Sequence, residues 1–227
     1  MTGFERQRLN MVESQLRPNE VTEPRLLAAM RALPRERFVP SKLAGLAYID
    51  EAIEVFPAID GAPARFLLAP MVLARLVQLA AVEPQHSVLD IGCATGYSTA
   101  VLASLGHHVT GLEPEPELAG AARENLRELG LDNADIVEGP LGAGFADRAL
   151  YDVIVLNGSV PEVPASLFAQ LKPDGRLATV LSGGANRSSQ GRAYLFIKVG
   201  TELSGVPHFD AGAQPLPGFS PEFCFSF

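Results

Sequence analysis

The sequence predicts an α/β protein built on a doubly wound, mostly parallel seven-stranded sheet, with a helical extension at the N-terminus. Beyond residue 86, short apolar runs alternate with stretches of helical periodicity, which is typical of parallel strands joined by helices. The first of these runs ends in a glycine-containing turn, and much of the chain before it carries helical periodicity. A chain of 227 residues is long enough for one large domain with an added subdomain.

The first third of the chain is predicted to be mainly helical. Apolar residues recur at helical spacing between residues 9 and 16, and Thr22 is a candidate N-cap for a second helix with Pro24 in its first turn. Residues 47–66 lack helical periodicity and are expected to be irregular or to form short strands. A further helix is predicted from Pro70 to just before residue 84.

The remaining elements follow from the alternation of apolar runs and helical periodicity. Strands are expected at residues 87–92, 108–113, 134–139, 151–158, 176–182, 193–200 and 222–227. Helices are expected at residues 97–106, 116–130 and 164–175. The polar, glycine-rich stretch 182–192 is predicted to be a mobile loop.

Composition excludes several classes of protein. The net charge is -8 and Lys and Arg do not cluster, which disfavours a nucleic-acid partner. No apolar run approaches the roughly 18–20 residues of a membrane span, and the polar N-terminus is unlike a signal peptide, so a soluble cytoplasmic protein is expected. Cys93 and Cys224 are far apart and lack metal-ligand spacing, so free thiols and no metal site are expected.

The turn after the first predicted strand, in "VLDIGCATGYS", carries the chemistry. Gly92 begins the turn, but Ala94 and Tyr97 stand where a dinucleotide-binding motif has its second and third glycines. Asp90 is also unfavourable beside a pyrophosphate, whereas it can bind an ammonium group. S-adenosylmethionine carries an ammonium and a sulfonium, and it suits such a site.

A second acid follows at the end of the next strand. Glu113 lies about 20 residues beyond the turn, where a carboxylate can accept hydrogen bonds from ribose hydroxyls. The alternative is an acid favoured by the dipole at the start of a helix. Asp90, Gly92, Gly96 and Glu113 occur together in the expected order, which favours a cofactor role.

These residues resemble the class I S-adenosylmethionine-dependent methyltransferases. "NMVESQLRPNEVTEPRLLAAMRALPRERFVP", then "AYID" and "LAPMVLARLVQL", resemble the N-terminal part of the protein-L-isoaspartate O-methyltransferase family. "YDVIVLNGSVPEVPASLFAQLKPDGRL" resembles its fourth strand, following helix and fifth strand. The likeness spans most of residues 4–182, and beyond them only "AQPLPGF" is similar to a family segment.

The resemblance implies a Rossmann-like fold in which residues 71–227 form the S-adenosylmethionine-binding domain and residues 1–70 a helical and irregular subdomain packed on it. It implies S-adenosylmethionine as donor, S-adenosylhomocysteine as product, and damaged proteins or peptides carrying isoaspartate as partners of a monomer or weak homodimer. The cofactor-binding residues that it implies are Asp90, Gly92, Cys93, Ala94 and Gly96 for the methionyl part, Glu113 and Pro114 for the ribose, Gly139, Pro140 and Leu141 for the adenine, and Asn157 near the methyl group.

The residues expected to bind the methyl acceptor differ from those of the family. A Ser-x-Pro element is expected before the helix at 70, its serine holding the substrate carboxylate; here Leu68, Ala69 and Pro70 stand in its place. Pro140 replaces an acidic residue that the family often has against the adenine. Methylation of L-isoaspartyl carboxyls is the leading interpretation. The alternatives are a different small-molecule acceptor, or a cofactor-binding protein with little transferase activity.

A carboxylate acceptor needs no general base, because it is already anionic at neutral pH. His86, His107 and His108 precede strands, at the wrong end of the sheet for a site at the strand C-termini, so they are expected to be turn or surface residues. The catalytic candidates are Asn157 and Ser159, whose hydroxyl could replace the missing serine. Phe66, Leu67 and Leu68 form either an apolar rim or core.

Overall fold

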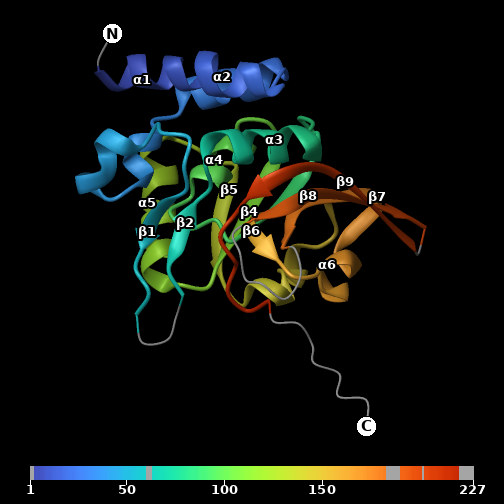
Figure 1. Ribbon diagram of the computed structural model, residues 1–227. Helices are drawn as coiled ribbons and strands as arrows, with labels where there is room; N and C mark the ends of the chain where they lie inside the picture. The colour runs from blue at the N-terminus through green and yellow to red at the C-terminus, as the bar shows by residue number, and fades with distance from the viewer. Residues whose placement is uncertain (1–2, 60–62, 183–189, 201, 220–227) are drawn as a thin grey trace.

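The computed structural model describes residues 3–59, 63–182, 190–200 and 202–219 (Figure 1). The helices are α1 (Gly3–Met11), α2 (Pro24–Ala32), α3 (Pro70–Ala80), α4 (Tyr97–Ala103), α5 (Pro116–Glu128) and α6 (Ala165–Ala169). The strands are β1 (Ile53–Phe56), β2 (Arg65–Leu67), β3 (Ser87–Ile91), β4 (His108–Glu113), β5 (Ala134–Glu138), β6 (Tyr151–Val160), β7 (Leu171–Ser182), β8 (Gln190–Val199) and β9 (Glu202–Gly212). Short π and 3₁₀ turns lie at Val12–Leu16, Arg17–Asn19, Arg35–Phe38, Ser41–Leu46, Leu141–Ala143 and Ala146–Arg148.

The seven-stranded sheet has the order β5-β4-β3-β6-β7-β8-β9 and confirms the predicted fold class. Strands β3 to β7 are parallel, and β8 and β9 join antiparallel at one edge. The chain leaves β3 toward β4 on one side and later returns to β6 on the other. The carboxyl ends of β3, β4 and β6 therefore border the crevice in which α/β sheets of this kind bind ligands.

Both faces of the sheet are covered, so its central strands are apolar almost throughout. Along β6, Val153 and Val155 belong to a core cluster with α2, α3, α4 and α5. Ile154 and Leu156 belong to a second cluster on the opposite face with α6. The alternation follows from the two-residue repeat of a strand.

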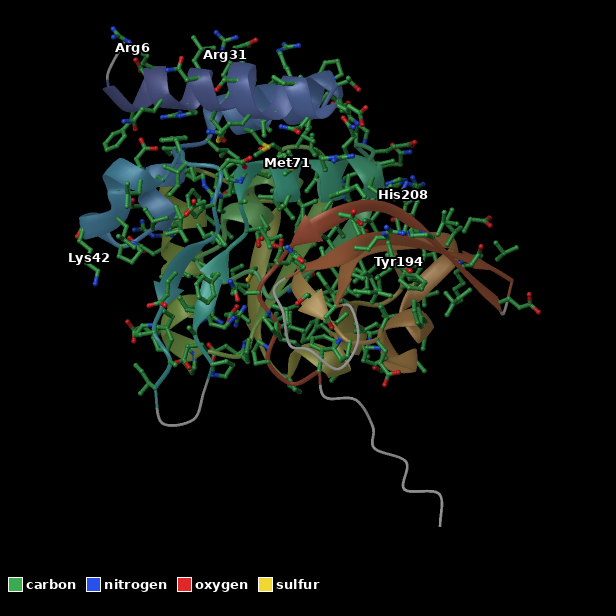
Figure 2. All side chains as sticks on the ribbon, in the orientation of Figure 1. Arg6, Arg31, Lys42, Met71, Tyr194 and His208 are labelled. Atoms are coloured by element: carbon green, nitrogen blue, oxygen red, sulfur yellow. The ribbon has the colours of Figure 1, made fainter. Side chains whose placement is uncertain are left out.

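The N-terminal part of the chain forms an additional layer over the face of the sheet that α3 and α4 cover. Helices α1 and α2 lie above α3 and α4 in Figure 1, and Arg6 and Arg31 point outward from them in Figure 2. Strands β1 and β2 pair antiparallel as a separate two-stranded sheet, as expected for the stretch 47–66. This hairpin brings residues 65–69 to the glycine turn after β3, because the Arg65 side chain approaches Gly92.

Four local predictions were wrong. Helix α2 is capped by Glu23, which accepts a hydrogen bond from the Leu26 amide at 2.9 Å, and not by Thr22. The helix expected over 164–175 ends at residue 169, because Asp174 takes a left-handed conformation (φ 61°) and residues 171–182 join the sheet as β7.

The third error concerns the last strand of the sheet. Strand β9 carries mostly exposed side chains and includes Gly205 and Pro207, so its apolar pattern is too weak to predict a strand. The strand expected at 222–227 lies outside the described residues, as do residues 183–189 of the predicted loop 182–192. The loop prediction was wrong at its two ends, because Ser182 is the last residue of β7 and residues 190–192 begin β8.

Candidate active site

Asp90 lies near the carboxyl end of β3 and is fully buried. Ser98 Oγ and Thr99 Oγ1, both from α4, donate hydrogen bonds to its Oδ2 at 2.8 and 2.6 Å. Asn157 Nδ2, from β6, donates to its Oδ1. Burial raises the pKa of Asp90 to about 6, and these three donors oppose that rise. The carboxylate is held by hydrogen bonds alone, without a cation among its described partners.

Glu113 ends β4 and is also fully buried. Arg65 Nη1, from β2, forms an ion pair with its Oε1. The Ala94 amide donates to Oε2 at 2.8 Å, and the Glu115 amide donates to Oε1 at 3.3 Å. Burial raises the pKa of Glu113, and the Arg65 guanidinium works against that rise. Both oxygens at the predicted ribose position are therefore already hydrogen-bonded.

The turn between the two acids keeps the backbone of a glycine loop. Gly92 and Gly96 have φ angles of +76° and +92°, and Ala94 has a φ of +49°. A Cβ at Gly92 would lie 2.7 Å from Leu216 Cδ2 and 3.3 Å from Arg65 Nη2. Close approach therefore requires a glycine at 92, and two side chains from distant segments fill the space in front of it.

The segment containing Leu216 is fixed beside β6. The Ser159 amide donates to the Gln214 carbonyl and the Leu216 amide donates to the Ser159 carbonyl, both at 2.9 Å. Leu216 also belongs to the core cluster that contains Leu112 and Leu141. The "AQPLPGF" stretch thus covers the carboxyl ends of the central strands.

The residues predicted to lie near the adenine are less closely gathered. Leu141 is buried beside Leu112, and Gly139 is half-buried at the end of β5. Pro114 and Pro140 are exposed. The structure thus joins Leu141 to the region of the glycine turn and leaves the two prolines at its outer edge.

The side predicted to bind the methyl acceptor, called the acceptor side below, contains a small cavity of about 10 Å³. Its lining combines the glycine turn with the segment that replaces the Ser-x-Pro element, and comprises Arg35, Phe66, Leu67, Leu68, Leu73, Gly92, Cys93, Tyr97, Ser98 and Asn157. Leu68 and Ala69 are buried, and Pro70 is the first residue of α3. Leu67 and Leu68 are therefore core residues that also face the cavity, and not an exposed rim.

Asn157 connects the two sides. Its Nδ2 binds Asp90, whereas its Oδ1 has no hydrogen-bond partner among the described residues. Ser159 Oγ is also buried and unpaired, but Ser159 is not part of the cavity lining. Of the two catalytic candidates, the structure brings Asn157 alone into the cavity.

Four residues of this region were not predicted from the sequence: Arg35, Arg65, Tyr97 and Leu216. Arg65 is a single cation among apolar neighbours in "ARFLLAP", and that isolation is a signal that could have drawn attention to it. Arg35 stands beside Glu36 and close to Arg37 in "LPRERFVP", and nothing in this stretch distinguishes it from an exposed arginine. Tyr97 stands at the third glycine position of a dinucleotide-binding motif, which does not indicate a role in binding. Leu216 lies in a segment without periodicity.

The histidines lie where the sequence predicted. His86 and His107 precede β3 and β4, and His108 is the first residue of β4, so all three are at the amino ends of the parallel strands. His86 is 8% exposed, and its Nδ1 accepts a hydrogen bond from the Glu83 amide. His208 is exposed on β9 (Figure 2).

Comparison with known proteins identifies the class to which this site belongs. Residues 6–191 match the family model described as protein-L-isoaspartate(D-aspartate) O-methyltransferase. A protein-L-isoaspartate O-methyltransferase of Protochlamydia amoebophila is 37% identical over 180 residues, which are 79% of this chain and 82% of the relative.

No helix in the described part of the chain combines the length and apolarity needed to cross a bilayer.

Solved structures agree with this class. A protein-L-isoaspartate O-methyltransferase with 25% identity superposes with a TM-score of 0.80, covering 94% of this chain and 67% of that one. The Plasmodium falciparum structure, in complex with S-adenosyl-L-homocysteine, has a TM-score of 0.73 at 18% identity, covers 96% of this chain and 100% of that chain, and shares the fold. The chain belongs to the protein-L-isoaspartate O-methyltransferase family, whose members are S-adenosylmethionine-dependent enzymes.

Proposed function

We propose that this chain transfers the methyl group of S-adenosylmethionine to the carboxyl group of L-isoaspartyl residues in damaged proteins. The observation that carries the proposal is the pair of buried acids, Asp90 and Glu113, on either side of a glycine turn at the carboxyl ends of adjacent strands. Membership of the family supplies the acceptor class.

The residues at this end of the sheet fit the donor chemically. Asp90 supplies negative charge for the ammonium and sulfonium groups, and Glu113 supplies acceptors for ribose hydroxyls. The missing side chain of Gly92 allows close approach of a ligand to the backbone, whereas a Cβ at Gly96 would meet Ala122 of α5. The fit requires Arg65 and Leu216 to move from the front of Gly92, since the cavity of about 10 Å³ holds no more than one water.

The protein's task in this reaction is to align the acceptor. When bound, S-adenosylmethionine supplies a methyl group whose bond to sulfur breaks as the attacking oxygen bonds to the carbon, with the electron pair passing to sulfur. A carboxylate is anionic at neutral pH, so no residue has to remove a proton. Asn157 lies between Asp90 and the cavity, where it orients the reacting groups, and exclusion of water by Leu67 and Leu68 strengthens the electrostatic contacts.

The proposal also covers the organisation of the chain. It assigns donor binding to residues 71–227 and the covering of the acceptor side to residues 1–70. It places the activity in the cytoplasm, in a monomer or weak homodimer, which sedimentation velocity of the purified protein tests.

The deciding experiment incubates the purified protein with S-adenosylmethionine and an isoaspartyl peptide. We expect a base-labile methyl ester on the peptide and an equal amount of S-adenosylhomocysteine. The same peptide with ordinary aspartate is the control substrate. Glu113→Gln is the control variant, assayed at a temperature at which circular dichroism shows that it is folded. Release of S-adenosylhomocysteine only with small-molecule extracts would replace the proposed acceptor, and release with neither would leave a donor-binding protein.

A further inference from the structure

The acceptor side contains a buried cation that the roles assigned above leave unused. Arg35 is fully buried; its Nε donates to the Ala47 carbonyl and its Nη2 to the Leu68 carbonyl, both at 2.8 Å. Within the described ranges, Nη1 has no hydrogen-bond partner, and no carboxylate forms an ion pair with this guanidinium. An unpaired charge in a protein interior is unfavourable, so this arrangement calls for a partner.

Tyr97 supplies the second unpaired polar group. The Arg35 guanidinium lies over the Tyr97 ring, 4.7 Å from its centroid, which offsets part of the cost of burying the charge. Burial raises the pKa of the Tyr97 phenol, which therefore keeps its proton, although Arg35 opposes the rise. Its Oη also has no hydrogen-bond partner among the described residues. Arg35 and Tyr97 thus interact mainly with each other, and both line one cavity, where Nη1 and Oη can turn to an anion.

The position of these donors matches the missing serine. Nη2 of Arg35 binds the main chain of Leu68, the residue that stands where the family has the carboxylate-binding hydroxyl. The same cavity is lined by Gly92 and Asn157, so its other wall is the donor side. The cavity of about 10 Å³ has to widen to admit a carboxylate, as it does for the donor, and the carboxylate would then lie between Arg35 on one wall and Gly92 and Asn157 on the other.

We infer that Arg35 and Tyr97 bind the carboxylate of the methyl acceptor, in place of the serine that Leu68 replaces. The inference rests on the proposed function. Because two carbonyls engage Nε and Nη2, the guanidinium holds one carboxylate oxygen through Nη1 and leaves the other free to attack. The methyl ester is neutral and loses the ion pair, which favours its release.

Kinetics with the isoaspartyl peptide test the inference in two variants. Tyr97→Phe removes only an unpaired hydroxyl and keeps the ring, so it should fold normally. We expect KM for the peptide to rise about tenfold, the effect of one hydrogen bond to a charged group. The change in kcat should be smaller, and the affinity for S-adenosylhomocysteine in calorimetry should stay within about twofold. Arg35→Lys cannot reach both carbonyls and the substrate, so its KM should rise further.

The matched control is Tyr151→Phe. The Tyr151 hydroxyl is bonded to the Phe145 carbonyl at 2.8 Å, in the core cluster on the opposite face of the sheet. This variant should lose stability and keep the wild-type KM, the reverse of Tyr97→Phe. A second readout is inhibition by a peptide whose isoaspartyl carboxyl is amidated: Tyr97→Phe should distinguish the amide from the carboxylate about tenfold less well than the wild type.

The outcomes separate the two proposals. A wild type that methylates the peptide, together with a Tyr97→Phe protein of unchanged KM and unchanged discrimination, overturns the role of Arg35 and Tyr97 and leaves the proposed function intact. Absence of methyl ester with the wild-type enzyme overturns the proposed function and the inference with it. Because Tyr97→Phe decides the matter alone, failure of Arg35→Lys to fold does not affect the test.

Discussion

The donor side and the acceptor side of this site differ in whether their buried polar atoms have hydrogen-bond partners. On the donor side, Asp90 and Glu113 are fully buried, and each of their carboxylate oxygens has a hydrogen-bond partner. On the acceptor side, Arg35 Nη1, Tyr97 Oη and Asn157 Oδ1 are buried without a partner in the described part of the chain. The donor side is thus a completed polar network, whereas the acceptor side has polar groups left over.

The difference indicates how each ligand would bind. To bind Glu113, the ribose hydroxyls of the donor have to replace Arg65 as the partner of this carboxylate. The binding free energy of the donor is therefore the difference between its own contacts with Glu113 and the lost ion pair. An acceptor carboxylate breaks no ion pair, and it satisfies atoms that are otherwise without a hydrogen-bond partner once the cavity has widened to admit it. Removing a charged group on the donor side should therefore change stability as well as affinity, and removing an unpaired polar group on the acceptor side should mainly change KM.

The largest effect is expected from breaking the Arg65–Glu113 pair. Glu113→Gln leaves the Arg65 charge buried and unpaired, which should lower the free energy of unfolding by about 3–5 kcal/mol. Glu113→Gln/Arg65→Met removes both charges and should recover most of that loss in urea denaturation. Donor binding should stay weak in both variants. A double variant that remains as unstable as the single one would show that the pair is not the source of the effect.

The next largest effect concerns Asp90 and pH. Its pKa rises from 3.8 to about 6 in the folded protein, so the folded state binds the proton more tightly than the unfolded state. The Asp90 contribution to stability is therefore fully present below about pH 4 and is lost as pH rises through about 6. The total corresponds to about 3 kcal/mol.

Asp90→Asn removes this dependence. The stability of the Asn variant relative to wild type should therefore increase between pH 4 and 7 in urea denaturation at matched ionic strength. Donor affinity of the wild type should fall below about pH 6, where Asp90 becomes neutral, and the Asn variant should show a flatter profile. A parallel pair of stability curves would mean that the pKa of Asp90 is the same in the folded and unfolded states, so that burial does not raise it.

These two sides also differ in how far the sequence could predict them. The turn and both acids of the donor side follow from local order along the chain, because a strand, a turn and the end of the next strand occupy fixed places in an α/β sheet. Arg65 and Leu216 could not be predicted in the same way. They reach Gly92 from a hairpin before β3 and a segment after β9, and only the tertiary fold brings them there.

The acceptor side could also be predicted only in part from the sequence. The absence of the family serine at 68 is visible in the sequence, but its consequence depends on Arg35, which lies 33 residues earlier. Arginines are usually exposed, so burial of Arg35 contradicts the ordinary expectation for its type. The missed strand β9 and the helix predicted too far beyond α6 are errors of the same kind. In both places, pairing in the sheet determines the secondary structure.

A smaller effect is expected on the acceptor side, from Leu68→Ser. The new hydroxyl adds a donor for the substrate carboxylate, so kcat/KM for the isoaspartyl peptide should rise about tenfold, the effect of one such hydrogen bond. Stability should fall by about 2–3 kcal/mol, because a buried leucine is lost. Leu67→Ser is the matched control: it lines the same cavity and should lose similar stability without a gain in activity. A gain in both variants would point to a loosened cavity instead of a new hydrogen bond.

The smallest effect returns to the donor side, at Ala94. Its left-handed backbone, with a φ of +49°, is unfavourable for any residue with a Cβ, and its amide donates to Glu113. Ala94→Gly should raise the free energy of unfolding by about 1 kcal/mol and leave donor affinity within about twofold, because the amide is retained. Ala81→Gly, at a left-handed C-cap of α3 with a φ of +48°, should give the same stability gain. If Ala94→Gly alone weakened donor binding, the methyl group at 94 would be a ligand contact, and the donor side would depend on shape as well as on its completed hydrogen bonds.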